Sequence, residues 1–156
     1  MRQRKILFAV LAGLFFLPVA SQLFAQEDVI KKRIELMKSN NSAAKAIKKA
    51  LKEKDFNTIE SKAKVIAGNM DKVLDLFPKG STSEKSRAKP EIWEKWDEFS
   101  KLPGKVKAAA EALAKAAVAN DEAEVRVQIK AIGGFRSVAC GNCHKSFVKP
   151  RKKKKK

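Results

Sequence analysis

The chain has 156 residues, enough for a single domain, and a formal net charge of +18. Its two cysteines and one histidine are too few for a structural zinc site, which takes four ligands. The sequence has no second histidine, no Ser/His/Asp set and no phosphate-binding loop, so we do not expect an enzyme.

Residues 1–25 have the pattern of a secretory signal peptide. A basic start is followed by an uncharged apolar run over residues 6–20 and by the small residue Ala25, which suits cleavage before Gln26. An uncleaved anchor is the alternative, but the apolar run is shorter than the roughly 20 residues that span a bilayer. The sequence therefore predicts export to the periplasm and one domain over residues 26–148.

The first half of this domain predicts two amphipathic helices, over residues 27–54 and 57–76. The inner face of the first is predicted at Ile30, Ile34, Met37, Asn41, Ala44 and Leu51. The inner face of the second is predicted at Ile59, Ala63, Ile66, Met70, Val73 and Phe77. Asn57, with Glu60 three residues later, resembles a capping box that starts the second helix.

A third helix is predicted from Pro90, after a polar loop over residues 78–89. Its apolar positions are Ile92, Trp96, Phe99, Val106, Ala110, Leu113 and Ala117. The spacing continues through Pro103 and Gly104, so we expect a kink within one helix rather than two helices.

A fourth helix is predicted from Asp121, which is spaced as a cap pair with Glu124. Its inner positions are Val125, Ile129, Ile132, Phe135, Ala139 and Cys143. The chain has few β-branched runs and no hairpin signal. Four helices joined mostly by short turns predict an all-α, antiparallel up-down-up-down four-helix bundle, whose core can enclose a flat apolar cofactor.

The last turns of the fourth predicted helix carry Cys140-Gly141-Asn142-Cys143-His144. Two thiols three residues apart, followed at once by an imidazole, form the attachment sequence of a c-type haem. The pattern predicts one haem c bound covalently through Cys140 and Cys143, with His144 as the proximal iron ligand. A thioredoxin-like redox pair and a chance match are the alternatives. The redox pair opens a helix after a strand, and no strand-rich segment precedes Cys140.

Residues 149–156 contain only basic residues and one proline. These like charges repel one another and have nothing apolar to bury, so the sequence predicts a disordered polybasic tail. Such a tail can contact an anionic membrane at roughly 1 kcal/mol per basic residue, or it can serve solubility alone. No nucleic-acid partner is expected, because the chain has no nucleic-acid-binding motif.

Four short motifs, at residues 33–40, 76–81, 88–93 and 139–144, resemble those of the class II c-type cytochromes. This family includes cytochrome c′ and the low-spin cytochrome c-556 group, and the resemblance covers the chain from the predicted cleavage point to the basic tail. The stretch from Leu36 to Asn40 is closer to the low-spin group.

The resemblance implies two readings of the distal side of the haem. In the low-spin group, a methionine at the position of Met37 is the sixth iron ligand, and the protein carries single electrons in the periplasm. We expect this reading. The alternative is a high-spin cytochrome c′, in which Met37 only packs on the haem and the open sixth position binds nitric oxide or carbon monoxide. Met70 on the second helix is a further candidate ligand.

The resemblance also implies a haem-propionate contact for Arg33, with a solvated surface arginine as the alternative. Four residues after His144, where many relatives have an arginine, this chain has Val148. A positive charge beside the proximal imidazole is therefore missing or displaced. Given the basic body, we expect redox partners with acidic docking faces, and either a monomer or a homodimer.

Overall fold

The computed structural model describes residues 19–132 and 139–150. Its elements, in chain order, are α1 (Val19–Glu53), α2 (Phe56–Met70), the 3-10 turn η1 (Leu74–Leu76), α3 (Glu91–Glu94), α4 (Trp96–Phe99), α5 (Leu102–Val118), α6 (Glu122–Ile132) and α7 (Cys140–Phe147). The described ranges contain no β-strand, only one isolated antiparallel bridge between Ala88 and Val148.

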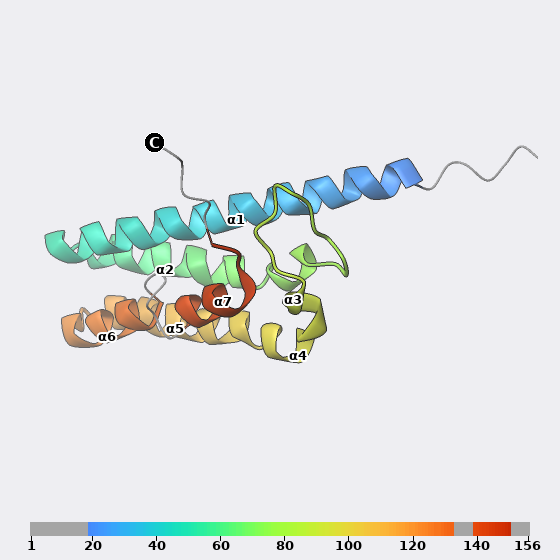
Figure 1. Cartoon of the computed structure of the whole chain (residues 1–156). Helices are drawn as coiled ribbons and strands as arrows, with labels where there is room; N and C mark the ends of the chain where they lie inside the picture. Colours follow the sequence, from blue (N-terminus) through green and yellow to red (C-terminus); the bar gives the residue numbers. More distant parts are fainter. Residues whose placement is uncertain (1–18, 133–138, 151–156) are drawn as a thin grey trace, which may run out of the picture.

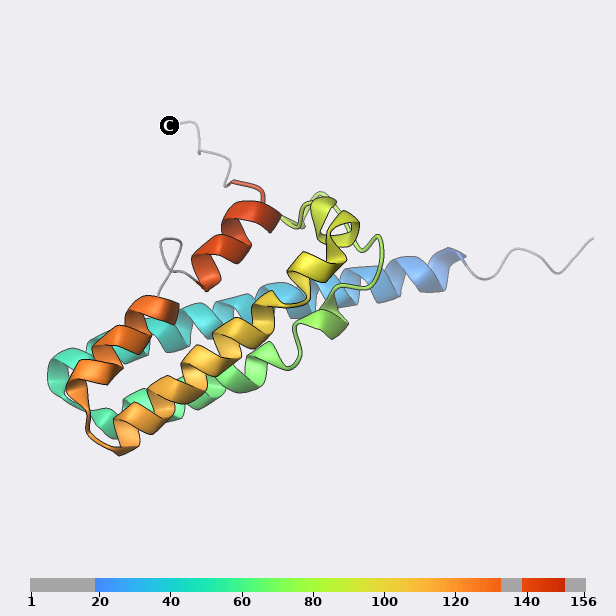
Figure 2. The same ribbon diagram turned by 90° about the horizontal axis from the view of Figure 1, so that it is seen from below.

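The long helices form an antiparallel bundle, which confirms the predicted fold class. Helices α1, α2, α5 and α6 run alternately in opposite directions (Figure 1), with α2 between α1 and α5 and with α6 against α5. Helix α7 contacts α3 and α5 and continues in the direction of α6 (Figure 2). Helices α6 and α7 therefore share the fourth position of the bundle, and the segment that carries the CxxCH motif lies beside the parts of the broken third helix.

The buried face of α1 agrees with the predicted one at Ile30 and differs from it further along the helix. The residues of α1 that pack in the core include Leu36, Ala43, Ile47 and Ala50, whereas the side chain of Ile34 is 38% exposed. The predicted positions Met37, Asn41 and Ala44 line a cavity instead. Helix α1 thus has two inward stripes, one against α2 and one toward a cavity, and sequence spacing alone does not separate them.

Helix α2 begins and ends earlier than predicted. Asp55, not Asn57, is its N-cap: the carboxylate accepts the backbone N–H of Thr58 at 2.9 Å. Glu60 instead accepts the Lys64 ammonium at 2.6 Å. The helix ends at Met70, and η1 carries the chain on to Phe77. The apolar spacing continues because a 3-10 turn also brings side chains three residues apart onto one face.

The third helix is broken, and the predicted kink at Pro103 is wrong. The chain leaves helical geometry at Lys95, where φ is −116° and ψ is 45°, and this residue separates α3 from α4. Pro103 lies in the first turn of α5. A proline is tolerated there because the N–H groups of a first turn have no partner within the helix.

The fourth helix is divided as well. Its predicted start is confirmed, since the Asp121 carboxylate accepts the backbone N–H of Glu124 at 3.0 Å. Helix α6 ends at Ile132, and α7 begins at Cys140, so the CxxCH motif opens a separate helix. Phe135, which was predicted on the inner face, lies outside the described residues.

The structure leaves the two ends of the chain as predictions. Helix α1 begins at Val19, inside the predicted signal peptide, whose first part lies outside the described ranges, as does the end of the basic tail. Among the residues that the structure describes, no helix is both long and apolar enough to cross a membrane.

Candidate functional site: a cavity beside the CxxCH helix

The three residues of the CxxCH motif that carry chemistry lie on one face of α7. Cys143 and His144 follow Cys140 by three and four residues, the spacing of neighbours on a helix surface. All three side chains are half-buried and line the same cavity, which has a volume of about 170 Å³. The structure therefore brings both thiols and the imidazole to one cavity.

The rest of this cavity wall comes from the bundle helices. Helix α1 contributes Met37, Asn40, Asn41 and Ala44, and α2 contributes Ile66 and Met70. The start of α5 contributes Leu102, Pro103 and Val106. The lining is mostly apolar, so the cavity suits a flat apolar group held between helices. Both candidate distal ligands, Met37 and Met70, are at its wall.

Sequence reasoning missed Asn40, Leu102 and Pro103 as parts of this wall, whereas Val106 was predicted on the apolar face of its helix. Asn40 lies three residues after Met37, and that spacing was the available signal. The Asn69 amide nitrogen of α2 donates to the Asn40 side-chain oxygen at 2.8 Å and to the Ser39 hydroxyl at 3.0 Å. These bonds join α1 and α2 beside Met37. The first turn of α5 reaches the cavity only because of the way the broken third helix packs, which the sequence spacing does not reveal.

Burial controls the protonation of the motif. Burial raises the pKa of the Cys140 thiol. It also raises the pKa of Cys143 to about 11, and the nearby Cys140 adds to this shift. Burial lowers the pKa of His144, as does the positive charge of Arg87. These directions favour neutral thiols and a neutral imidazole, the form of histidine that binds a metal.

The end of α7 is held by the loop before α3. The backbone N–H of Lys89 donates to Phe147 O at 3.0 Å, and that of Lys149 donates to Arg87 O at 2.7 Å. The Arg87 guanidinium donates to Lys149 O from Nε at 2.9 Å and from Nη2 at 2.5 Å. Val148 is the partner of Ala88 in the isolated bridge between these segments. A cation from another part of the chain therefore lies at the end of the haem-motif helix.

Arg33 lies outside the cavity wall. Its side chain is only 6% exposed, and its guanidinium donates to Leu76 O, Ser81 O, Ser81 Oγ and Ser86 Oγ at 2.6–3.3 Å. It also stacks on Phe77, with 3.8 Å from Cζ to the ring centroid. Arg33 is therefore neither a solvated surface residue nor a cavity residue. The predicted propionate contact stays a prediction.

An aromatic cluster fills the end of the bundle near α4. Phe99 lies 4.9 Å from Phe77 and 5.4 Å from Phe147, measured between ring centroids. The Trp93 indole nitrogen donates to Phe77 O at 3.1 Å. None of these four residues is in the cavity wall. They pack the end of α7 against α4 and the turn after η1.

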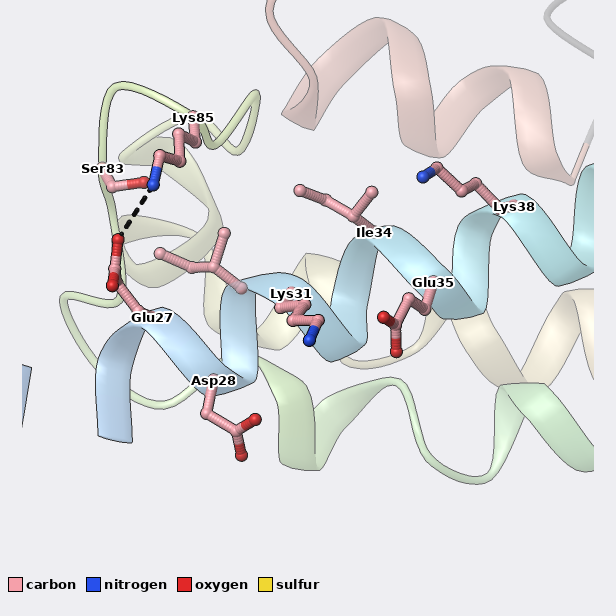
Figure 3. A pocket seen from close by; sticks show the side chains of 9 residues that line it. Glu27, Asp28, Lys31, Ile34, Glu35, Lys38, Ser83 and Lys85 are labelled. Carbon is pink, nitrogen blue, oxygen red and sulfur yellow. Dashed lines mark hydrogen bonds and ion pairs between the residues drawn. The ribbon is translucent and has the colours of Figure 1, made fainter. Parts of the chain in front are cut away.

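A larger hollow of about 390 Å³ lies between the start of α1 and the loop around Ser83, away from the motif. Figure 3 shows the ion pair of Glu27 with Lys85, at 3.1 Å, which joins the two sides of this hollow. Its wall combines acidic and basic side chains with Ile34. This mixture of charges selects no single kind of ligand, and we assign no function to the hollow.

A family model described as "Cytochrome C'" matches residues 28–148. Cytochrome c′ of Pararhodospirillum photometricum is 33% identical over 124 residues, which cover 78% of this chain and 96% of the relative. Cytochrome c-556 of Agrobacterium fabrum is 32% identical over 139 residues, covering 87% and 90%. The crystal structure of cytochrome c′ from Thermochromatium tepidum, 24% identical, matches with a TM-score of 0.71 over 80% of this chain and 98% of that one.

Proposed function

Because this chain belongs to the cytochrome c′ family, we propose that it is a periplasmic haem c protein in which small gases can reach the sixth iron position. Members of this family are electron-transfer haem proteins that bind haem c covalently. The haem would supply an iron that changes its charge by one electron and can bind nitric oxide or carbon monoxide. Attachment, orientation and the shape of the distal side depend on residues of this chain.

In this proposal, each residue of the motif has one task. The thiols of Cys140 and Cys143 would hold the haem covalently, and the His144 imidazole would bind its iron. The apolar residues of α2 and α5 exclude water from the cavity, and Met37 and Met70 pack on its distal side. The observation that carries the proposal is the mostly apolar cavity that contains both thiols and the imidazole in its wall.

The relatives support this open-site reading better than the His/Met carrier that we expected from the sequence. Three cytochromes c′ match between 78% and 93% of the chain, and the structural neighbours are also cytochromes c′. One of these neighbours is described as the nitric oxide complex of a mutant cytochrome c′ from Alcaligenes xylosoxidans. A methionine at position 37 is compatible with either reading, since it can bind iron or only pack against the haem.

A one-electron carrier with Met37 as the sixth ligand is the second candidate. Two observations favour it: Met37 is in the cavity wall, and cytochrome c-556 of Agrobacterium fabrum is among the relatives. Its partners would be redox proteins with acidic docking faces. One structural neighbour is a cytochrome c′ with a ligand-controlled dissociation of its dimer, and a homodimer of this chain remains part of the proposal.

The absorption spectrum of the purified holoprotein, recorded oxidised and reduced and with and without carbon monoxide, separates the two candidates. We expect a high-spin oxidised spectrum and a reduced spectrum that shifts on addition of the gas. We expect Met37→Ala to leave the spin state unchanged, since Met37 only packs on the haem. Met70→Leu is the matched control, because it changes the other methionine of the same cavity.

The opposite outcome is equally specific. A low-spin spectrum with a weak far-red sulfur-to-iron band, unaffected by carbon monoxide, contradicts the open site. If Met37→Ala then removes that band and Met70→Leu does not, Met37 is the ligand and the electron carrier replaces the gas-binding protein. If only Met70→Leu removes the band, Met70 is the ligand.

A further inference from the structure

Two cations from the loop before α3 are anchored at the C-terminal end of α7. The Arg87 guanidinium donates twice to Lys149 O. The Lys89 ammonium donates to Ser146 O at 3.1 Å and to Lys145 O at 3.4 Å. A helix C-terminus carries partial negative charge and unpaired carbonyls, which attract cations. Helix α7 itself has no acidic residue that would neutralise them.

The position of Arg87 is set from both sides of its backbone. Its carbonyl accepts the Lys149 N–H at 2.7 Å. Before it, the Ser86 hydroxyl accepts from Arg33 at 3.3 Å and from the Ala88 N–H at 3.2 Å. Ser86 and Ala88 are both buried. Hydrogen bonds therefore hold the half-buried Arg87 side chain at both ends. Its backbone is held by the neighbouring contacts, and its guanidinium is held by the carbonyl of Lys149, which lies five residues after His144.

We propose that Arg87 is a positioned positive charge on the proximal side of the haem, where it favours the reduced state of the iron. The inference rests on the role of His144 as proximal ligand, which is part of the proposed function. The isolated bridge between Ala88 and Val148 brings the loop that carries Arg87 beside the residues that follow α7.

The physical argument is electrostatic. The oxidised iron carries one more positive charge than the reduced iron, so a fixed cation nearby raises the free energy of the oxidised state. Arg87 is not a candidate iron ligand, and we describe it as a positioning residue that acts through charge.

The test is the midpoint potential of the holoprotein, measured by spectroelectrochemistry for three variants. Arg87→Gln removes the charge and retains a donor for Lys149 O, whereas Arg87→Met removes both. Arg87→Lys keeps the charge. We expect each neutral variant to lower the equilibrium constant for reduction of the haem about threefold. This corresponds to a midpoint potential that is about 30 mV lower, at about 59 mV per tenfold change. Arg87→Lys should restore most of the potential. One of the two neutral variants in folded form is enough for the comparison.

Arg126→Gln is the matched control. It removes the same charge from α6, where Arg126 pairs with Glu122 outside the cavity wall. We expect this variant to have the same midpoint potential as the unmodified protein. Equal potentials for Arg87→Gln and Arg126→Gln would overturn the proposal. So would a potential for Arg87→Lys as low as that of Arg87→Gln, since contact rather than charge would then be responsible. The carbon monoxide experiment tests the sixth position separately, so the two proposals can fail independently.

Discussion

Arg33 shows at the scale of a single residue how a buried cation can be accommodated. Burial lowers the pKa of the guanidinium to about 10, so it is still charged at neutral pH. Its bonds to Leu76, Ser81 and Ser86, and its contact with Phe77, compensate for the lost water. Arg33 lies four residues before Met37, and its bonds to Ser81 and Ser86 connect helix α1 to the loop that also carries Arg87.

We expect Arg33→Leu to lower the free energy of unfolding by about 3 kcal/mol, because one buried carbonyl, one partly buried carbonyl and two hydroxyls lose their donor. Arg33→Lys should recover part of the loss, since an ammonium cannot reproduce the fork of the guanidinium. Denaturant unfolding of the holoprotein measures both. Lys32→Leu, an exposed change on the same helix, is the control and should have little effect.

The same Arg33 variants test the predicted propionate contact. If Arg33 binds a propionate, the midpoint potential and the haem spectrum of a folded Arg33→Lys protein should change. If only stability changes, the guanidinium serves the loop, and the propionate prediction is wrong. A loss of stability no larger than that of Lys32→Leu would contradict the structural role.

At the scale of elements, the ends of the helices depend on side chains that the apolar spacing does not reveal. The Asp55 carboxylate caps α2 by accepting from both the backbone N–H and the hydroxyl of Thr58. The side-chain and backbone bonds from Thr58 hold the pKa of Asp55 below its usual value. Asp55 lies two residues before the predicted cap. Since several polar residues precede the helix, the geometry of the turn decides which of them is the cap.

We expect Asp55→Ala to destabilise the protein at neutral pH, and the difference from the unmodified protein to shrink in acid. A carboxyl with a lowered folded pKa contributes stability above its unfolded pKa, near 3.8, and loses it as the pH falls through the lower folded value. Thermal unfolding between pH 7 and pH 3 measures this. Asn57→Ala, at the predicted cap, should have little effect on stability. A larger loss of stability for Asn57→Ala than for Asp55→Ala would contradict the assignment of Asp55 as the N-cap.

At the scale of the whole molecule, the excess of basic residues is the dominant property. The full chain has a formal charge of +18, and three of its basic residues lie in the predicted signal peptide. Exposed lysines occur along α1, in the loop before α3 and on α7. A strongly basic surface attracts anionic reactants over a distance that salt shortens. The attraction is independent of the sixth iron ligand, so it applies to both candidate functions.

We expect oxidation of the reduced holoprotein by the anion hexacyanoferrate(III) to slow about tenfold between low and high ionic strength. A cationic cobalt complex of similar potential should show the opposite trend, because salt screens repulsion as well as attraction. Stopped-flow kinetics measure both rates. Similar salt dependence for the two oxidants would mean that the charge of the molecule does not steer its electron-transfer encounters.

The sequence alone determined the helical class, the four-part bundle and the three residues of the CxxCH motif that carry chemistry. These depend on short spacings along the chain, which a helix converts directly into one face. The cavity confirms that Cys140, Cys143 and His144 share one wall. The predicted stripe of α1 was right about Met37 and wrong about Ile34 as a buried position.

Only the tertiary structure decided where the third and fourth helices break, where the Arg33 guanidinium binds, and which residues complete the cavity. Each depends on contacts between segments far apart in the chain: Arg33 with Ser81 and Ser86, and Arg87 with Lys149. No periodic spacing encodes such contacts, because they form only when loops pack on helices. The proposed role of Arg87 depends in the same way on its contact with Lys149, which exists only in the folded chain.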